Sequence, residues 1–358
     1  MSPQRSPAHD QTEARLITTL LISRLPEHEQ GHLLARPGGE PGGDPRLEDP
    51  GLRLRAGEEL AQWRAEGIGV VARGSTGYPA ELSHIHAPPP LLFYRGTPLA
   101  EYGERPAVSI VGSRRGDSEA CAFARELAAG IARRGGIVVS GLALGIDAAA
   151  HRGALEPTSL RQTTIAVLGN GLRRVYPSLH ERLAEEILAR GGTVVSQFEP
   201  DERPWPVNFL NRNRVIAGLS RGIIVVQAAA RSGSLATARH ALEEGREVMS
   251  VPWGVREPRA AGSNRLLQQG AHLIMGLEDV ARIVPGLTGP PAPASTPPSA
   301  VKPDHVTVIT AFGDDRSLSF DELRRRCAGL PGLSTTVLEL ELARLVERLP
   351  GNQIARRS

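Results

Sequence analysis

Four short segments rich in glycine or serine follow apolar runs of the sequence, and their residue types suit phosphate binding. They are Gly112 to Arg115 (GSRR), Gly141 to Gly145 (GLALG), Gly169 to Gly171 (GNG) and Arg231 to Ser234 (RSGS). Such turns expose backbone N–H groups to an anion, and a following helix adds the positive end of its dipole. Glycine is also common in structural turns, so its coincidence with arginine is the stronger signal. The candidate binding residues here are Gly112, Ser113, Arg114, Arg115, Gly169, Asn170, Ser232, Gly233 and Ser234.

The segment Asn208 to Ser220 (NFLNRNRVIAGLS) is a further candidate site. If Asn211 caps the helix that the following apolar residues imply, Arg212, Asn213 and Arg214 fill the first turn of that helix. Two cations at the positive end of a helix dipole are unfavourable by about 0.3–1 kcal/mol each, and a bound polyanion would relieve this. The alternative is that one of the two arginines pairs with a carboxylate in the core.

The region around this segment is basic, although the whole chain has a net charge of only +3. From Arg203 to Gly270 there are ten arginines and four acidic residues, which indicates an anionic ligand. Three aromatic residues near this region could stack on bases: Tyr176, Trp205 and Phe209. Aromatic residues are more often part of a core, so both alternatives stand.

Several other chemistries lack the residues that they need. Lys302 is the only lysine, so there is no Walker A loop, and no turn has the G-x-G-x-x-G spacing of a dinucleotide site. Asp147 and His151 could form an acid–base pair with Ser140 or a serine of the RSGS segment, but no G-x-S-x-G elbow surrounds these serines. The two cysteines lie far apart and suggest neither zinc nor a disulfide. We therefore expect a binding protein, not an enzyme, with no metal or other cofactor.

The elements that must position these residues can be predicted from hydrophobic periodicity. Helical patterns such as residues 118–133, which place Phe123, Leu127 and Ile131 on one stripe, separate continuous apolar runs. This alternation predicts an α/β fold with a doubly wound, mainly parallel sheet whose ligands bind at the carboxyl ends of the strands. The predicted strands are Ala107 to Val111, Ile137 to Ser140, Thr164 to Leu168, Thr193 to Ser196, Ile223 to Val226 and Val248 to Val251.

Composition predicts further parts of the chain on both sides of this core. Residues 37–51 are rich in Pro, Gly and acid, which predicts a loop, and residues 285–303 have almost no core-forming side chains. The expected order is a disordered tail (1–10), a small helical N-terminal domain with the Gly/Pro loop (11–78), the core (79–285), a Pro-rich linker (286–303) and a C-terminal module (304–358).

The C-terminal module has the pattern of helices followed by a hairpin. Ser319 can cap a helix that runs to about Cys327, and Ser334 can cap another that runs to about Leu349, before a turn at residues 350–352. This order is typical of a winged helix, and a generic helical adaptor fits nearly as well.

No segment of the sequence predicts insertion in a membrane. The apolar stretch Leu16 to Leu25 is short, contains Arg24 and lacks a cleavage site of small residues, so it predicts an amphipathic helix. We therefore expect a cytoplasmic protein with no membrane contact.

Five motifs together carry a family resemblance. Ser140 to His151 (SGLALGIDAAAH), Leu168 to Pro177 (LGNGLRRVYP), Arg212 to Ser220 (RNRVIAGLS) and Ser232 to Ala238 (SGSLATA) follow Gly112-Ser113-Arg114 in this order. In this combination the chain resembles the DNA-processing protein DprA (Smf) family, and the resemblance covers about residues 79–274.

The resemblance implies an extended Rossmann-like core that binds single-stranded DNA without known catalysis. It also implies a homodimer that loads RecA recombinase onto incoming DNA during natural transformation. In that family a Gly-Ser-Arg loop and an RNR segment line a positively charged DNA pocket. By position, the residues concerned are Gly112, Ser113, Arg114, Phe209, Arg212, Asn213 and Arg214.

Five residues depart from the family pattern. Leu144 stands where a basic residue is frequent, Arg173 where Asp is common and Leu210 where Pro is usual, while Gln197 and Gln227 replace glutamates. These changes of charge roughly cancel, and the lost acids make the site more basic.

Two alternatives come from other functional classes. One is a lysine decarboxylase-like enzyme of the nucleoside monophosphate phosphoribohydrolase type, but its PGGxGTxxE signature needs an acid where Arg239 and His240 follow the turn here. The other is a transcriptional regulator that acts through the C-terminal module. The expected recognition helix of that module is rich in Leu and Glu, which suits contact with protein better than contact with DNA.

Overall fold

The chain forms two compact units, Met1–Pro291 and Ala292–Ser358. A computed structural model describes residues 7–34, 44–157, 162–287 and, with short gaps, 303–356. Most of the expected linker therefore lies outside the described residues, as do the first six residues of the expected tail. Helix α1 (Pro7–Ser23) begins inside that tail. Among the described residues, no helix is both long and apolar enough to cross a bilayer.

A nine-stranded sheet lies at the centre of the first unit, in the order β1-β2-β6-β5-β4-β3-β7-β8-β9. From β6 to β9 in this order, neighbouring strands are parallel, as predicted. The chain adds strands β4, β5 and β6 on one side of β3 and strands β7, β8 and β9 on its other side, so the strand order reverses beside β3. Each predicted strand is present within one residue of its expected bounds. These strands are β3 (Ala107–Val111), β4 (Ile137–Ser140), β5 (Thr164–Val167), β6 (Thr193–Ser196), β7 (Gly222–Val225) and β8 (Glu247–Ser250).

Three further strands were not predicted. β1 (Gly69–Ala72) and β2 (Leu91–Gly96) add an antiparallel extension next to β6, and β9 (His272–Leu273) pairs with β8 at the opposite edge. β1 falls within residues 11–78, for which a helical domain is expected, and joins the sheet of the core.

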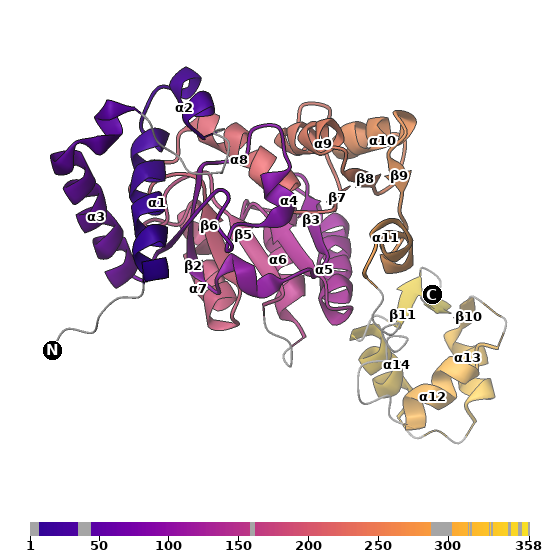
Figure 1. Cartoon of the computed structure of the whole chain (residues 1–358). Coiled ribbons are helices and arrows are strands. Elements are labelled where there is room, and N and C mark those ends of the chain that lie inside the picture. The colour runs from indigo at the N-terminus through magenta and orange to yellow at the C-terminus, as the bar shows by residue number, and fades with distance from the viewer. Residues whose placement is uncertain are drawn as a thin grey trace, which may run out of the picture. The chain divides into compact units, whose positions relative to one another are not determined.

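Helices cover both faces of the sheet, which explains why β3, β4, β5, β6 and β7 are buried at every residue (Figure 1). One face carries α5 (Ser118–Arg133), α6 (Ile146–Leu155), α7 (Glu181–Ala189) and α11 (Leu277–Ile283). The other face carries α4 (Ala80–Ser83), α8 (Pro206–Gly218), α9 (Gly233–Glu243) and α10 (Ala261–Gln268).

The N-terminal helices pack over β1 and β2 and share an apolar core with α7. They are α1, α2 (Glu27–Leu34) and α3 (Pro50–Ala65), with a short 3-10 helix at Pro45–Glu48. α3 begins within the loop expected over 37–51, because Pro50 suits the first turn of a helix and the Asp49 carboxylate accepts the Leu52 N–H at 2.8 Å.

The second unit has the winged-helix order, which confirms that prediction. A three-stranded sheet in the order β10-β12-β11 packs with three helices around an apolar core that includes Phe312 and Leu340. The elements are α12 (Pro303–Thr310), β10 (Ser317–Ser319), α13 (Phe320–Arg326), α14 (Leu333–Leu342), β11 (Val346–Leu349) and β12 (Gln353–Arg356).

Inside this unit one cap is present and one predicted helix is wrong. The Ser319 hydroxyl accepts the Glu322 N–H at 3.2 Å and caps α13 as expected. α14 begins at Leu333, so Ser334 lies inside the helix. The helix predicted to reach Leu349 ends at Leu342, because residues 346–349 pair with β12 as a strand. The turn predicted at residues 350–352 lies outside the described residues.

His151 on α6 is a fully buried titratable group between the helix and the sheet. Its Nδ1 lies 2.8 Å from the Thr164 hydroxyl, and its Nε2 is buried without a hydrogen-bond partner among the described residues. Burial, helped by nearby His180, lowers the pKa of His151 to about 3. The imidazole is therefore neutral in the folded protein over most of the acidic range.

This histidine should make folding sensitive to acid. The folded pKa lies below the unfolded value of about 6.5, so its contribution to stability is complete above pH 6.5 and is lost as the pH falls towards 3. In urea titrations from pH 7 to pH 4, the wild type should lose up to about 1.4 kcal/mol of unfolding free energy per pH unit more than His151→Gln. Parallel profiles for the two proteins would contradict this.

Candidate functional site

A pocket of about 670 Å³ opens at the carboxyl ends of β3 and β7, beside the point where the strand order reverses. This is where ligands bind in open parallel sheets. The loop after β3, the loop before α9 and one face of α8 form its walls. The lining includes Gly112, Ser113, Arg114, Arg115, Ala143, Asp147, Tyr176, Phe209, Arg212, Asn213, Arg231, Ser232, Gly233 and Ser234.

Three of the residues expected at the site do not line this pocket. Gly169 lies under the ring of Phe209, where a Cβ atom would come within 2.6 Å of the ring. Asn170 is buried and donates to the carbonyls of Gly171 and Arg174. Arg214 donates to the Gln197 side chain at 3.3 Å instead of lining the pocket. Gly169 thus supports the pocket wall from below.

The predicted cap of α8 is wrong. Trp205 occupies the N-cap position and Pro206 begins the helix, so Asn211 and Arg212 lie in its middle. Pro206 has a fixed φ that suits the first turn, and this early start was not read from the sequence. The arginines therefore do not oppose the positive end of the helix dipole, and that electrostatic argument for a polyanion no longer applies.

Arg212 is instead a buried cation that joins the ends of two strands. Its side chain is only 4% exposed, and its Nη1 donates to the Gly141 carbonyl at 2.8 Å and also to the Val167 carbonyl. Burial lowers its pKa to about 10, so the guanidinium remains protonated at neutral pH. No carboxylate of the described residues lies within ion-pair distance of it. The two carbonyl dipoles therefore stabilise the positive charge of Arg212 on one side of the guanidinium, and the other side of the guanidinium faces the pocket.

Asp147, on α6, binds the loop after β4 that contains Gly141. Its carboxylate accepts the N–H groups of Gly141 at 3.1 Å and Ala143 at 3.4 Å. Burial raises the pKa of Asp147, and the positive charge of Arg212 opposes that rise. Gly141 is thus bonded to an acid through its N–H and to a base through its C=O. It must be glycine, because a Cβ there would approach the Arg212 guanidinium to 2.7 Å.

The structure does not assemble the acid–base pair considered from the sequence. His151 is buried between α6 and β5 and does not line the pocket that Asp147 lines. Of the candidate serines, Ser140 is buried and donates to the Ile110 carbonyl, whereas Ser232 and Ser234 bond to each other at 2.7 Å. Among the described residues, no group of three His, Cys, Asp or Glu side chains could hold a metal ion.

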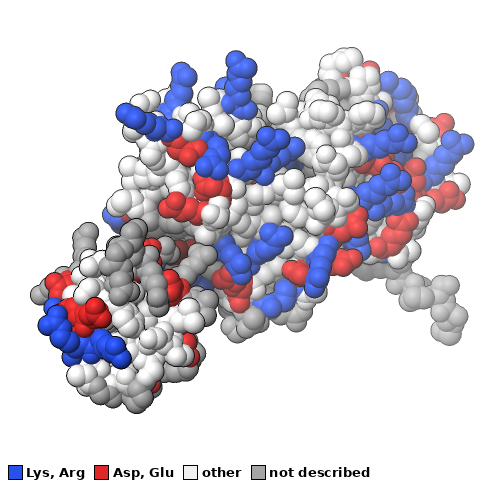
Figure 2. Space-filling model, turned by 180° about the vertical axis from the view of Figure 1, so that it is seen from behind, with Lys and Arg blue, Asp and Glu red and all other residues white. Residues whose placement is uncertain are grey.

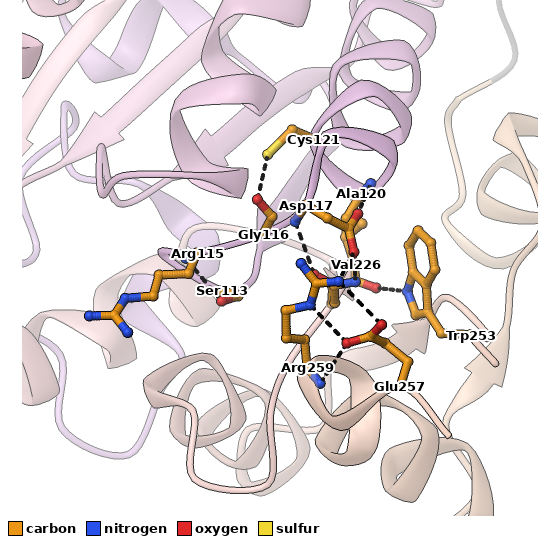
Figure 3. Close-up of polar contacts among 11 residues, drawn as sticks. Ser113, Arg115, Gly116, Asp117, Ala120, Cys121, Val226, Trp253, Glu257 and Arg259 are labelled. Carbon is orange, nitrogen blue, oxygen red and sulfur yellow. Dashed lines mark hydrogen bonds and ion pairs between the residues drawn. The ribbon is translucent and has the colours of Figure 1, made fainter. Parts of the chain in front are cut away.

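The loop after β3 is held in a fixed shape by Gln227. The Ser113 N–H donates to the Gln227 carbonyl at 2.7 Å, and the Gln227 amide donates to the Asp117 carboxylate at 2.7 Å. Figure 3 shows Asp117 beside the Arg259–Glu257 pair, while Arg115 extends away from this cluster. The clamp leaves the guanidinium groups of this loop free of carboxylate partners among the described residues.

Aromatic and cationic groups alternate along one wall of the pocket. The rings of Tyr176 and Phe209 lie 5.3 Å apart at 48°, and the guanidinium carbons of Arg114 and Arg212 lie 5.7 and 5.9 Å from the Phe209 ring centre. Tyr176 is 44% exposed. Trp205 is 54% exposed but does not line the pocket, so of the three aromatic candidates two form its wall.

Some lining residues were not predicted as site residues. Pro204, Pro206 and Leu210 form part of the rim, and Asp147 had been considered only as a possible acid. The Pro-Trp-Pro run before α8 was the signal that could have placed the rim, because proline at the first helical position marks where that helix begins.

Comparisons with known proteins agree with this geometry. The family model of DNA recombination-mediator protein A matches residues 69–285, and that of the DprA winged helix domain matches residues 290–352. The chain belongs to the DprA (Smf) family. The resemblance inferred from its motifs is therefore confirmed, and the DprA match begins with β1 rather than at residue 79.

Individual DprA relatives cover most of the chain. Protein Smf of Escherichia coli K12 is 36% identical over 329 residues, which are 86% of this chain and 86% of that protein. The DprA structure from Streptococcus pneumoniae has a TM-score of 0.60 and 31% identity and covers 76% of this chain and 95% of that one. A DprA structure from Helicobacter pylori, described as showing a unique single-stranded DNA binding mode, has a TM-score of 0.53 and 28% identity over 60% of this chain and 93% of that one.

Arg212 should contribute to folding as well as to the pocket. Replacing it with methionine removes the donors of two buried carbonyl groups, so Arg212→Met should lower the free energy of unfolding by about 1–3 kcal/mol. Arg115→Met is the matched control, since Arg115 is exposed and should change stability by no more than about 0.5 kcal/mol. Urea unfolding of both variants measures the difference. Equal stability of the two would show that Arg212 has no structural role.

Proposed function

We propose that the pocket at the carboxyl ends of β3 and β7 binds single-stranded DNA. The observation that carries the proposal is a set of four arginines that line one pocket and have no carboxylate partner among the described residues: Arg114, Arg115, Arg212 and Arg231. Unpaired guanidinium groups that converge on a pocket attract phosphate. The related protein from Helicobacter pylori, which binds single-stranded DNA, supports this choice of ligand.

The phosphate backbone would lie along the side of the pocket formed by α9. Ser232 caps this helix through the Ser234 N–H, and Gly233 is exposed with no atom within 4 Å of where a Cβ would stand. A phosphate can therefore approach the backbone closely at the positive end of the helix. Arg231 and Arg114 flank this point from two loops.

Unpaired bases would contact the aromatic side of the pocket. Tyr176 and Phe209 offer ring faces beside the phosphate side, and base stacking on such rings suits strands whose bases are not paired. On the face of the molecule in Figure 2, arginine side chains are interspersed with acidic ones, so the residues described there form no continuous basic stripe. On this face, the charges give no support for a broad basic binding surface.

We also propose that the protein acts as a homodimer that loads RecA recombinase onto the bound strand in natural transformation. Support for these roles comes from membership of the DprA family. Binding rather than catalysis is proposed for the pocket, because Asp147, the one carboxylate among its described lining residues, is committed to the N–H groups of Gly141 and Ala143.

Single-stranded DNA should bind more tightly than blunt duplex, and Arg114→Ala should weaken that binding by about 1–3 kcal/mol without lowering thermal stability. Arg133→Ala is the matched control, since Arg133 is exposed at the last turn of α5 and does not line the pocket. If about four to six phosphates are neutralised, log K against log salt should have a slope of about −3 to −4. Equal affinity for duplex, or equal losses in the two variants, would contradict the proposal.

The alternative enzyme function has a separate test. Purified protein should release no more product from ATP or from a nucleoside monophosphate than a buffer blank does. If turnover is found and disappears in Asp147→Asn, the pocket is catalytic, and the proposal that it only binds DNA is wrong. Turnover that persists in Asp147→Asn would indicate a contaminating enzyme.

A further inference from the structure

The outer edge of β1 is separate from the pocket described above, and the cavities at the two places share no lining residue among those described. β1 is the last strand at its end of the nine-stranded sheet, and it pairs only with β2. The Arg73 N–H donates to the Pro90 carbonyl at 2.9 Å, which fixes the positions that bond to β2. Because bonded and non-bonded pairs alternate in an antiparallel ladder, Gly69 and Val71 face β2, whereas Val70 and Ala72 direct their backbone groups away from it.

Three of these outward backbone groups have no partner among the described residues. The Ala72 carbonyl accepts the N–H and the hydroxyl of Ser75, at 3.1 and 2.7 Å. The Ala72 N–H and both groups of Val70 make no such bond. Unpaired N–H and C=O groups on a strand edge are a template for another strand. Ala72 is only 1% exposed, so the backbone groups open to a short extended segment are the N–H and C=O of Val70.

A pocket of about 780 Å³ opens along this edge, and Val70 is part of its lining. Helix α1 and the segment 98–100 form its sides, and the loop 74–77 closes one end. Its lining combines apolar side chains with hydroxyl groups, from Thr12, Arg15, Leu16, Thr18, Val70, Val71, Ala72, Ser75, Thr76, Tyr94, Pro98 and Leu99 among others. A mixture of this kind suits the alternating side chains of an extended peptide better than it suits a phosphate.

β1 contains none of the residue types that commonly protect an edge strand. Its sequence, Gly-Val-Val-Ala, contains no proline and no charge, and these are the residues that usually block pairing. The opposite edge differs, because β9 has only two residues and His272 on it contacts Glu247. Of the two edges, β1 is therefore the one open to strand addition.

The positive charge of Arg15 in this pocket favours peptides that carry an acidic residue. Among the lining residues that the structure describes, Arg15 is the only charged one, and none of them carries a carboxylate. The Arg15 guanidinium donates to the Arg73 carbonyl at 3.1 Å, while its Nε is buried without a partner among the described residues. We propose that the outer edge of β1 binds an extended peptide segment of another protein, which pairs with the backbone of Val70 and places a carboxylate beside Arg15.

Two matched pairs of variants in the full-length protein test this proposal. Val70→Pro removes the outward N–H without touching the bonds between β1 and β2, whereas Val70→Thr keeps that N–H and the branched shape. Arg15→Gln removes the charge, and Arg15→Lys keeps it. The probe is a phage-displayed library of random octapeptides, selected on the wild type, with an enriched sequence then synthesised with a fluorescent label.

The wild type should enrich peptides with alternating apolar residues and at least one Asp or Glu. Val70→Pro and Arg15→Gln should each weaken binding of the labelled peptide at least tenfold, whereas Val70→Thr and Arg15→Lys should stay within about threefold. Addition of peptide should slow hydrogen exchange in the fragment that contains residues 69–72, a measurement that needs no variant. Binding of single-stranded DNA should be unchanged in all four variants, so this test is independent of the DNA pocket.

Several outcomes would overturn the proposal. They are no enrichment over an unrelated protein, equal binding to Val70→Pro and Val70→Thr, enrichment of peptides without an acid, or no protection of residues 69–72. Light scattering tests a further occupant, a second copy of this chain. If the wild type forms a dimer that Val70→Pro dissociates, the edge pairs with itself and does not bind a peptide.

Discussion

The bonds from the buried guanidinium of Arg212 to the ends of β4 and β5 are the interaction on which the pocket depends. They join α8 on one face of the sheet to the carboxyl edge, where the loops of the pocket begin. Asp147 completes the arrangement by holding the same loop from α6, on the opposite face. A positive charge can stay in this apolar setting because carbonyl dipoles surround one side of it and the open pocket lies on the other.

Most of the fold could be predicted because its central strands are mainly apolar runs separated by clear helical patterns. Residues 118–133 form α5 with the predicted bounds, and each of the six predicted strands is present. β1 was missed because four residues, one of them a glycine, give too short a signal, and pairing with β2 decides their structure. The helix predicted to reach Leu349 failed for a related reason. The residues of β11 form a strand only because β12 lies beside them.

The site was predicted in part, and its errors have physical causes. The loops at Gly112 and Ser232 meet because parallel strands bring their carboxyl ends to one edge, which spacing along the chain can show. The direction in which each arginine points depends on where α8 begins. The helix begins at Pro206, five residues before Asn211, which the sequence suggested as its cap. Two departures from the family pattern also have a structural meaning. Gln227 clamps the loop after β3, and Arg173 pairs with Glu66 of the N-terminal region.

The contacts of Gly141 have a consequence for the evolution of this family. Any side chain at this position collides with the Arg212 guanidinium, and its two backbone groups serve an acid and a base at once. A lineage that replaces the arginine with a smaller residue frees the space and removes the reason for glycine. The two positions should therefore change together among homologous sequences, although 70 residues separate them in the chain. Such paired substitution would reveal the contact between Gly141 and Arg212 from sequences alone.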